Sequence, residues 1–332
     1  MPESHPDLSK VRLHVVTGKG GTGKTTAAAA AATALARQGR RVLLAEVEGR
    51  QGISQTFDVA PLGHTETRIL HHRAGGELWA MSVDAKDSLF DYLQKFYKAG
   101  RTRAILERFG AVDFATTIAP GVRDVLLIGK IYEAVGRRAK NGQAVYDAVV
   151  LDAPPTGRVV RFLNVNAEVA DVAKVGPIRS QADSITRMLR SHTTAVHVVT
   201  LLEEMPVQET VDALGELRRA GLPVGAIVVN QVREPLLSDK AMRSVTAART
   251  ARLAERVAAD LAAVGVRGSE EVAAGLIADG AQHADRVELE REQEAILATQ
   301  GRLTVRLPWL PEGTEGGGIS LLADAAAGQG LV

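Results

Sequence analysis

Short apolar runs alternate with longer helical patterns along most of the 332-residue chain. The runs are rich in Val, Leu and Ala and show no in–out alternation, which is typical of strands buried on both faces. We predict strands within residues 12–17, 40–48, 78–83, 146–157, 195–200, 224–231 and 302–311. Buried strands separated by helices predict an α/β fold, with a doubly wound, mostly parallel sheet covered by helices on both faces.

Helical patterns fill the intervals between these strands. The expected helices cover 24–39, 206–221, 235–299 with an interruption near 265–269, and 318–328. Between 84 and 140 a first apolar stripe is followed by a break at Pro120 and Gly121 and then by a second helix. The stripe consists of Leu89, Phe90, Leu93, Phe96 and Tyr97. We expect one domain over 1–332, with helical insertions at 84–140 and 166–194 that form a subdomain for a client or partner.

The glycine-rich segment after the first strand fits two phosphate-binding patterns. Gly18, Gly20 and Gly23 match the dinucleotide fingerprint G-x-G-x-x-G. The P-loop pattern G-x-x-x-x-G-K-[ST] is matched by Gly18 and by Gly23, Lys24 and Thr25, which are consecutive. The strand–loop–helix context suits both, so the neighbouring residues have to decide.

Three features favour the P-loop. The dinucleotide interpretation would use Glu46 or Glu48 to hold a ribose, but it has no use for the lysine at position 24. A P-loop needs Lys24 for the β- and γ-phosphates and the Thr25 hydroxyl for Mg²⁺. It also needs a carboxylate at a strand end, and Asp152 in "VVLDAP" supplies one, which would hold Mg²⁺ through water. The residues expected to bind ATP through this loop are Gly18, Gly20, Gly21, Thr22, Gly23, Lys24, Thr25 and Thr26.

The composition excludes several kinds of ligand and cofactor for this protein. Forty basic and thirty-nine acidic side chains leave a net charge of +1, so no global field favours nucleic acid or an anionic membrane. The sequence has no cysteine, which excludes disulfides, thiolate zinc sites and iron–sulfur clusters ligated by this chain. Neither a signal layout nor an apolar run of the roughly 20 residues that a membrane span needs is found. We expect a cytoplasmic protein without stable membrane insertion.

Two segments carry a resemblance to a known family. "KGGTGKT" resembles the deviant Walker A loop of the SIMIBI class of P-loop ATPases, with Lys19 as its additional lysine. "DAPPTGRVVRFL" resembles the switch II segment D-x-x-P-T-G-H-x-x-R-F-L of the ArsA/GET family. That family contains the arsenite-pump ATPases and the ATPases that target tail-anchored membrane proteins. The family's histidine is replaced here by Arg158.

The resemblance implies roles for further residues. Lys19 would reach across a dimer to the nucleotide of the facing subunit, and Asn230 would read the adenine. Pro308 and Pro311 of "LPWLP" would belong to the loop that covers the base. Where the family has the water-orienting aspartate of T-D-P-A-H, alignment on "VLL" places Glu48, one methylene longer, with Glu46 as a competing candidate.

The resemblance therefore implies a Mg·ATP-dependent dimeric switch, whose expected catalytic residues are Lys19, Lys24, Glu48 and Asp152. Hydrolysis would drive open and closed states that act on a protein client. An alternative is a regulatory or scaffold subunit that binds nucleotide, hydrolyses little and pairs with a paralogous ATPase. Homodimer and heterodimer both remain open, the expected cofactors are ATP and Mg²⁺, and no zinc, iron–sulfur cluster or nucleic acid is expected. Thiol-mediated arsenite binding is not expected in a chain without cysteine.

Overall fold

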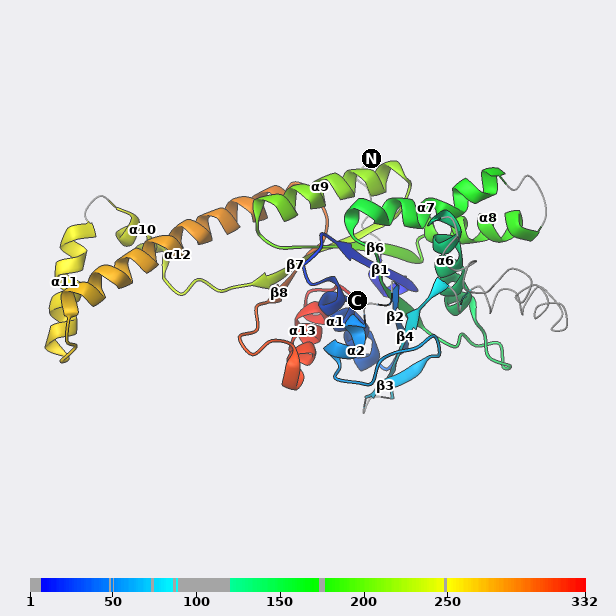
Figure 1. Cartoon of the computed structure of the whole chain (residues 1–332), viewed down its shortest axis with the longest axis horizontal. Helices are drawn as coiled ribbons and strands as arrows, with labels where there is room; N and C mark the ends of the chain where they lie inside the picture. The colour runs from blue at the N-terminus through cyan, green and yellow to red at the C-terminus, as the bar shows by residue number, and fades with distance from the viewer. Residues whose placement is uncertain are drawn as a thin grey trace.

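The structure is a computed structural model, and an eight-stranded sheet runs through its centre (Figure 1). It describes residues 7–47, 49, 51–72, 75–85, 88, 120–172, 177–247 and 250–332. The strand order is β3-β4-β2-β5-β1-β6-β7-β8, and every neighbouring pair is parallel except β3 with β4. The strands are β1 Leu13–Gly18, β2 Arg41–Val47, β3 Thr67–His71, β4 Glu77–Val83, β5 Ala148–Asp152, β6 Thr194–Thr200, β7 Val224–Val232 and β8 Thr304–Pro308.

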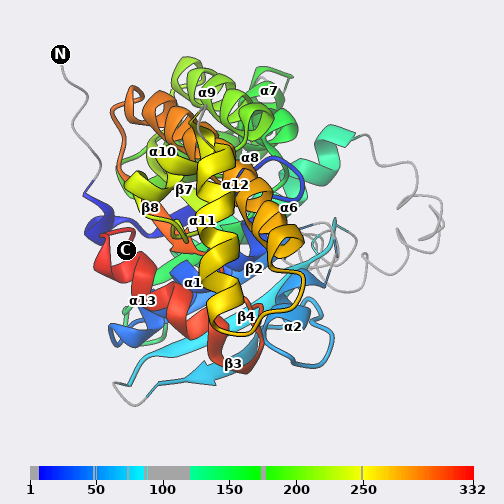
Figure 2. The same ribbon diagram turned by 90° about the vertical axis from the view of Figure 1, so that its left-hand side faces the viewer.

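Helices cover both faces of the sheet, as Figures 1 and 2 show. One face carries α1, α2 and α13, and the other carries α6, α7, α8 and α9. The helices described are α1 Lys24–Arg37, α2 Gly52–Thr56, α6 Pro120–Gly136, α7 Thr156–Val172, α8 Pro177–Leu189, α9 Glu204–Arg219, α10 Asp239–Thr246, α11 Thr250–Ala263, α12 Ser269–Ala298 and α13 Gly318–Gly328. The predicted doubly wound, mostly parallel α/β sheet is confirmed.

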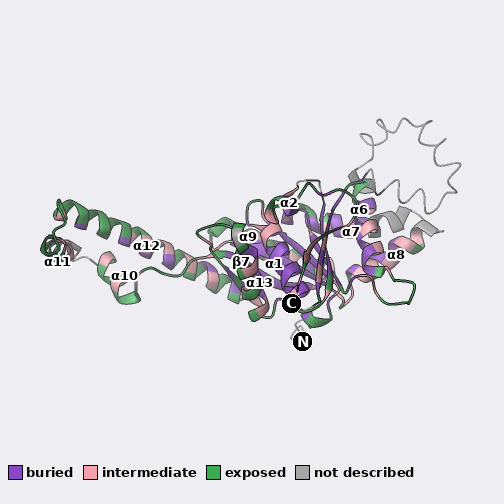
Figure 3. Ribbon diagram, turned by 90° about the horizontal axis from the view of Figure 1, so that it is seen from below, coloured by how far each residue is buried: buried purple, intermediate pink, exposed green. Residues whose placement is uncertain are grey.

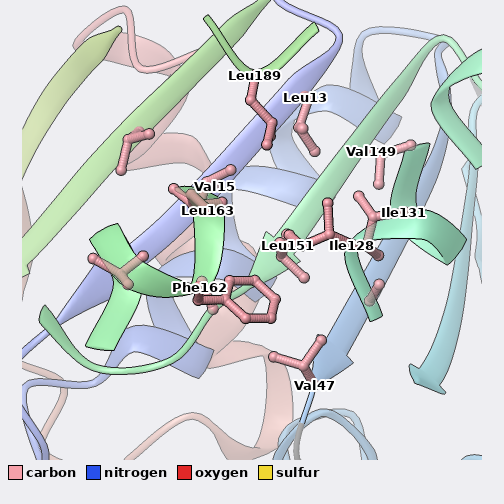
Figure 4. Packing of buried hydrophobic residues seen from close by; sticks show 14 of the residues in the cluster. Leu13, Val15, Val47, Ile128, Ile131, Val149, Leu151, Phe162, Leu163 and Leu189 are labelled. Carbon is pink, nitrogen blue, oxygen red and sulfur yellow. The ribbon is translucent and has the colours of Figure 1, made fainter. Parts of the chain in front are cut away.

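The core on the α6–α9 face consists mostly of branched aliphatic side chains, and Tyr146 and Phe162 are its buried aromatic residues; Figure 4 shows the part around Phe162. This core contains Leu13 and Val15 of β1, Leu151 of β5, and Phe162 and Leu163 of α7, with Val15 beside Leu163 and Leu151 beside Phe162. All five are at most 2% exposed. Burying side chains of this size stabilises a fold by roughly 1.5–3 kcal/mol each, so this packing holds α7 against the sheet.

The opposite face depends on small side chains. Helix α1 buries Ala27 to Ala32, together with Ala34 and Ala36, against the sheet and α13. Alanine has the strongest helix propensity, and its single methyl group lets the helix axis lie close to the strands. Gly39, with φ of 86°, follows the end of α1 in the left-handed conformation typical of helix ends.

Helices α10 and α11 and the outer part of α12 form an arm that projects from the sheet (Figures 1 and 3). Helix α11 packs along α12, and Met242 of α10 packs against Ala284 and Val287 of α12. Four apolar side chains of the arm are exposed where α11 turns into α12, namely Val264, Val266, Val272 and Leu276. The predicted interruption near residues 265–269 is this turn, and a second break follows α10.

The structure corrects the predicted elements in three places. Strand β3 was not predicted, because this antiparallel edge strand is short and half exposed and lacks a buried apolar run. Helix α2 was missed because it has only five residues. Helix α6 includes Pro120 and Gly121, which were expected to precede it, since proline is favoured in the first turn of a helix. The apolar stripe at 89–97 lies outside the described residues, and the division into insertions at 84–140 and 166–194 stays a prediction.

Candidate functional site

The glycine-rich loop connects the carboxyl end of β1 to the amino end of α1. Gly23 precedes α1 with φ of 85°, a conformation that L side chains rarely adopt. A Cβ at Gly23 would also overlap the amide nitrogen of Asn230. A Cβ at Gly18 would likewise overlap the backbone carbonyl oxygen of Val199 on β6. Both glycines are therefore required by close packing, and they leave the first amides of α1 directed at one site.

Lys24 folds back over this loop from the first turn of α1. Its side chain is buried, and its Nζ donates to the backbone carbonyl of Lys19 at 3.2 Å. The Thr22 hydroxyl donates to the same carbonyl at 2.9 Å. A nearly buried ammonium beside a helix amino terminus, inside a ring of backbone groups, attracts an anion such as a polyphosphate.

Thr25 and Asp152 meet beside Lys24. The Thr25 hydroxyl donates to Asp152 Oδ2 at 2.6 Å, although the two residues are 127 positions apart in sequence. They line a pocket of about 280 Å³ together with the loop and the end of β2. Its lining residues are Gly21, Gly23, Lys24, Thr25, Glu46, Val47, Asp152 and Ala153.

The oxygen donors of this pocket suit Mg²⁺. Mg²⁺ prefers oxygen ligands, keeps several waters and binds proteins through one or two side chains plus substrate phosphates. Thr25 and Asp152 offer a hydroxyl and a carboxylate at such a corner. Among the residues that the structure describes, no group of three His, Cys, Asp or Glu side chains could hold a metal ion. When bound with ATP, Mg²⁺ would neutralise charge on the phosphates, and Thr25 and Asp152 would hold it.

Asn230 lies on the other side of the loop, at the end of β7. It is buried, and its Nδ2 donates to the backbone carbonyl of Thr22 at 3.0 Å. Asn230 and the adjoining Gln231 line a second hollow of about 200 Å³. Gln231 has a φ of 56°, which is uncommon for a residue other than glycine. The hollow is completed by Leu201, Leu202, Glu203, Val232, Arg233, Arg286, Leu289 and Glu290.

Apolar side chains from three segments of the chain and the amides of Asn230 and Gln231 line the hollow together with four charged residues, and such a mixture of apolar surface and polar groups can hold a nucleotide base. Pro308 and Pro311, expected to cover the base, are exposed and do not line it. Between them the Trp309 amide donates to the Val232 carbonyl at 2.8 Å, and the Arg233 guanidinium stacks 4.6 Å from the centre of the Trp309 ring. The roles of Asn230 and the two prolines stay predictions.

Lys19, the additional lysine of the loop, turns away from the phosphate pocket. Its Nζ forms an ion pair with Glu209 Oε1 of α9 at 2.7 Å, and it does not line the pocket. Both side chains are about one-third exposed, at 33% and 37%. Glu209 had no signal in the sequence, because it is one of several acidic residues on a helix whose position relative to the loop only the fold sets.

Glu46 lies near the carboxyl end of β2. Glu48 lies outside the described residues, so its expected water-orienting role stays a prediction. Glu46 is 2% exposed and lines the phosphate pocket. Its carboxylate accepts the backbone amides of Gln51 at 2.9 Å and Ile53 at 3.2 Å. Sequence reasoning weighed Glu46 only as an alternative to Glu48 and missed this contact with α2.

The switch II segment begins helix α7. Thr156 is its first residue and is buried, whereas Arg158, at the position of the family's histidine, is exposed. The preceding turn is tied to β1, because the Thr17 hydroxyl donates to the Pro154 carbonyl at 2.7 Å. Of the other loop residues, Gly20 and Gly21 have open space where a Cβ would lie, and Thr26 follows Thr25 in α1.

A glycine loop at the carboxyl edge of a parallel sheet, with a buried lysine at a helix amino terminus and a hydroxyl–carboxylate pair, defines a P-loop nucleotide triphosphatase. Comparison with known proteins agrees. A family profile described as anion-transporting ATPase matches residues 11–191, more than half of the chain. ATPase BagA of Mycobacterium tuberculosis is 46% identical over 324 residues, covering 98% of this chain and 95% of its own.

More distant relatives agree with this assignment. A protein of Aquifex aeolicus named for an arsenical pump-driving ATPase is 22% identical over 253 residues, 67% of this chain and 80% of its own. ATPase ASNA1 homolog 1 of Paramecium tetraurelia is 28% identical over 153 residues, 45% of this chain and 42% of its own. The chain belongs to the anion-transporting (ArsA) ATPase family, and it is an ATPase. Among the described helices none is both long and apolar enough to cross a membrane.

Proposed function

We propose that this ATPase works as a Mg·ATP-dependent dimeric switch whose open and closed states act on a protein client. The observation that carries the proposal is the direction of Lys19. Its ammonium points to α9 and away from the phosphate pocket of its own chain, in which Lys24 already supplies a cation. This direction supports a role in which Lys19 contributes charge to a nucleotide held by a facing subunit, as an arginine finger does in trans.

The position of the hollow beside Asn230 supports coupling between ATP hydrolysis and a movement of the arm. The base hollow is lined by Arg286, Leu289 and Glu290 of α12, and the same helix continues into the arm. The exposed apolar side chains at the far end of the arm would give a protein client a surface to bind. A helix that contacts nucleotide at one end and client at the other would transmit a rigid-body shift between them.

The test is Mg²⁺-dependent ATP turnover of the purified chain over a range of protein concentrations. Turnover per subunit should rise with concentration, and Lys24→Ala, Lys19→Ala and Glu48→Gln should each lower it at least tenfold. Lys140→Ala, at an exposed position in the turn after α6, is the matched control and should be unchanged. A rate per subunit that does not depend on concentration, with full activity in Lys19→Ala, would exclude the dimeric switch.

The alternative is a nucleotide-binding regulatory subunit that pairs with a paralogous ATPase. Two departures from the family pattern support it, since Glu48 stands at the position of the water-orienting aspartate and Arg158 at that of the histidine. This chain would then bind ATP tightly, turn it over slowly alone, and raise turnover when mixed with the paralogue. The same assay separates the two functions, because only the switch reaches its full rate of hydrolysis without a second protein.

A further inference from the structure

We infer that Glu46 is a positioning residue of the ATPase site, which holds the first turn of α2 against Thr25 and so fixes the corner where Mg²⁺ binds. The inference rests on the Mg·ATP part of the proposed function and is independent of the dimer and of the client. It assigns Glu46 a task other than orienting water.

Register places Glu46 beside Asp152. The two residues are paired across the parallel strands β2 and β5, both at the carboxyl edge of the sheet, and both line the phosphate pocket. Two neighbouring carboxylates repel each other unless each has its own donors. Asp152 receives the Thr25 hydroxyl, whereas Glu46 receives two backbone amides of the chain that enters α2.

Helix α2 depends on Glu46 for its amino-terminal cap. The residue at the N-cap position, Gln51, makes no side-chain cap hydrogen bond of its own and has a φ of 56°. Its side chain is used elsewhere, because it bonds the backbone amide and carbonyl of Leu62 at 2.8 and 2.9 Å. The free amides of Gln51 and Ile53 are instead satisfied by the Glu46 carboxylate. A charged acceptor at a helix amino terminus is favourable for both the orphan amides and the helix dipole.

The first turn of α2 lies beside Thr25. A Cβ at Gly52 would lie 3.2 Å from Thr25 Cγ2 and 3.3 Å from Thr25 Oγ1, so the backbone of α2 forms the wall behind that hydroxyl. Ile53 is fully buried in the core beneath α1 and prevents α2 from sliding away. Contacts therefore run from Glu46 through Gly52 to Thr25, and from Thr25 to Asp152.

Two substitutions perturb these contacts from opposite ends. Glu46→Gln keeps the shape of the side chain but replaces one acceptor oxygen with an amide NH2, a donor that cannot accept a backbone N–H, so the first turn of α2 should loosen. Gly52→Ala keeps the cap and favours helix, but its methyl group pushes directly on Thr25. Gly129→Ala is the matched control for Gly52→Ala, because a Cβ in that part of α6 meets nothing within 4 Å. Glu288→Gln, on the exposed side of α12, is the control for Glu46→Gln.

The first measurement is amide hydrogen exchange of the full chain without nucleotide, followed for the peptide that covers residues 51–57. Glu46→Gln should raise its exchange rate at least tenfold, while Gly52→Ala should not raise it. This result stands whether or not the chain turns ATP over. An unchanged rate in Glu46→Gln would overturn the inference, since the carboxylate would then not be holding α2.

The second measurement is the Mg²⁺ concentration that gives half-maximal enhancement of binding of a fluorescent N-methylanthraniloyl-ATP. Both Glu46→Gln and Gly52→Ala should raise it about three- to tenfold, with binding in EDTA unchanged within twofold. A shift in Glu46→Gln with wild-type behaviour of Gly52→Ala would mean that Glu46 acts directly on the metal, and would overturn the positioning role. Loss of nucleotide binding in the wild type would refute the proposed function alone, and the exchange result would still decide the inference.

Discussion

Two buried histidines make the fold sensitive to acid. His14 of β1 and His197 of β6 stack with their ring centres 5.3 Å apart, and His14 Nδ1 lies 3.1 Å from His197 Nε2. His197 Nδ1 accepts the Ala226 amide at 3.1 Å, so this nitrogen carries no proton and Nε2 is the one that donates to His14. A Cβ at Gly225 would lie 2.8 Å from the His197 ring, which shows how closely this site is packed.

Burial lowers the pKa of His197 from 6.5 to about 4, and burial together with the charge of His197 lowers the pKa of His14 well below its usual value. Because the folded-state pKa is depressed, the unfolded chain takes up the proton first as pH falls. The stabilisation is complete above about pH 7 and is lost as pH falls through 6.5 towards 4. For His197 alone the loss is about 2 kcal/mol at pH 5 and approaches about 3 kcal/mol near pH 4.

The assay is urea unfolding at pH 7.5 and pH 5.0 at one ionic strength, for the wild type and His197→Asn. An asparagine oxygen can still accept the Ala226 amide, but the side chain does not titrate. The variant should be less stable at pH 7.5, yet its loss between the two pH values should be smaller than that of the wild type by about 2 kcal/mol. His192→Asn, at an exposed position, should keep the wild-type difference. Equal pH-dependent losses in the wild type and His197→Asn would refute the reasoning.

Three further changes test other parts of the structure. Gly23→Ala should weaken binding of the fluorescent ATP analogue at least tenfold, because backbone strain of about 1–3 kcal/mol in the left-handed conformation adds to the overlap with Asn230. The control is Gly142→Ala, in an exposed turn with φ of 83°, which should bind the analogue normally. Glu209→Gln should lower the protein concentration that gives half-maximal turnover about 1.4- to 5-fold, because a partly exposed ion pair restrains Lys19 by about 0.2–1 kcal/mol. Glu216→Gln is the control. An unchanged concentration in Glu209→Gln would show that the ion pair does not restrain Lys19. Arg137→Met should lower the free energy of unfolding in urea by about 2 kcal/mol. Arg137 pairs with Glu66 at 2.6 Å and with Glu133 at 2.5 Å, and the substitution would remove this cation from two half-buried carboxylates. A loss as small as that of the exposed Arg138→Met would contradict this expectation.

The sequence by itself determined the parallel part of the sheet, the loop and the residue types of the phosphate site. Strands buried on both faces carry a continuous apolar signal, and a P-loop is a local motif whose glycines, Lys24 and Thr25 act within a few residues of each other. Asp152 was also within reach, because a carboxylate at a strand end after "VVL" is recognisable beside such a loop. These features depend on short stretches of chain, and local sequence specifies them.

Only the tertiary structure decided which residues meet across elements. The Lys19–Glu209 pair joins the loop to α9, and α12 lines the hollow beside Asn230 with residues more than fifty positions further along the chain. In the sequence, Glu46 was only a competing candidate to Glu48 for orienting water, and the fold placed α2 against its carboxylate. Contacts of this kind depend on strand order and helix packing, which involve side chains far apart in sequence, so no local pattern encodes them.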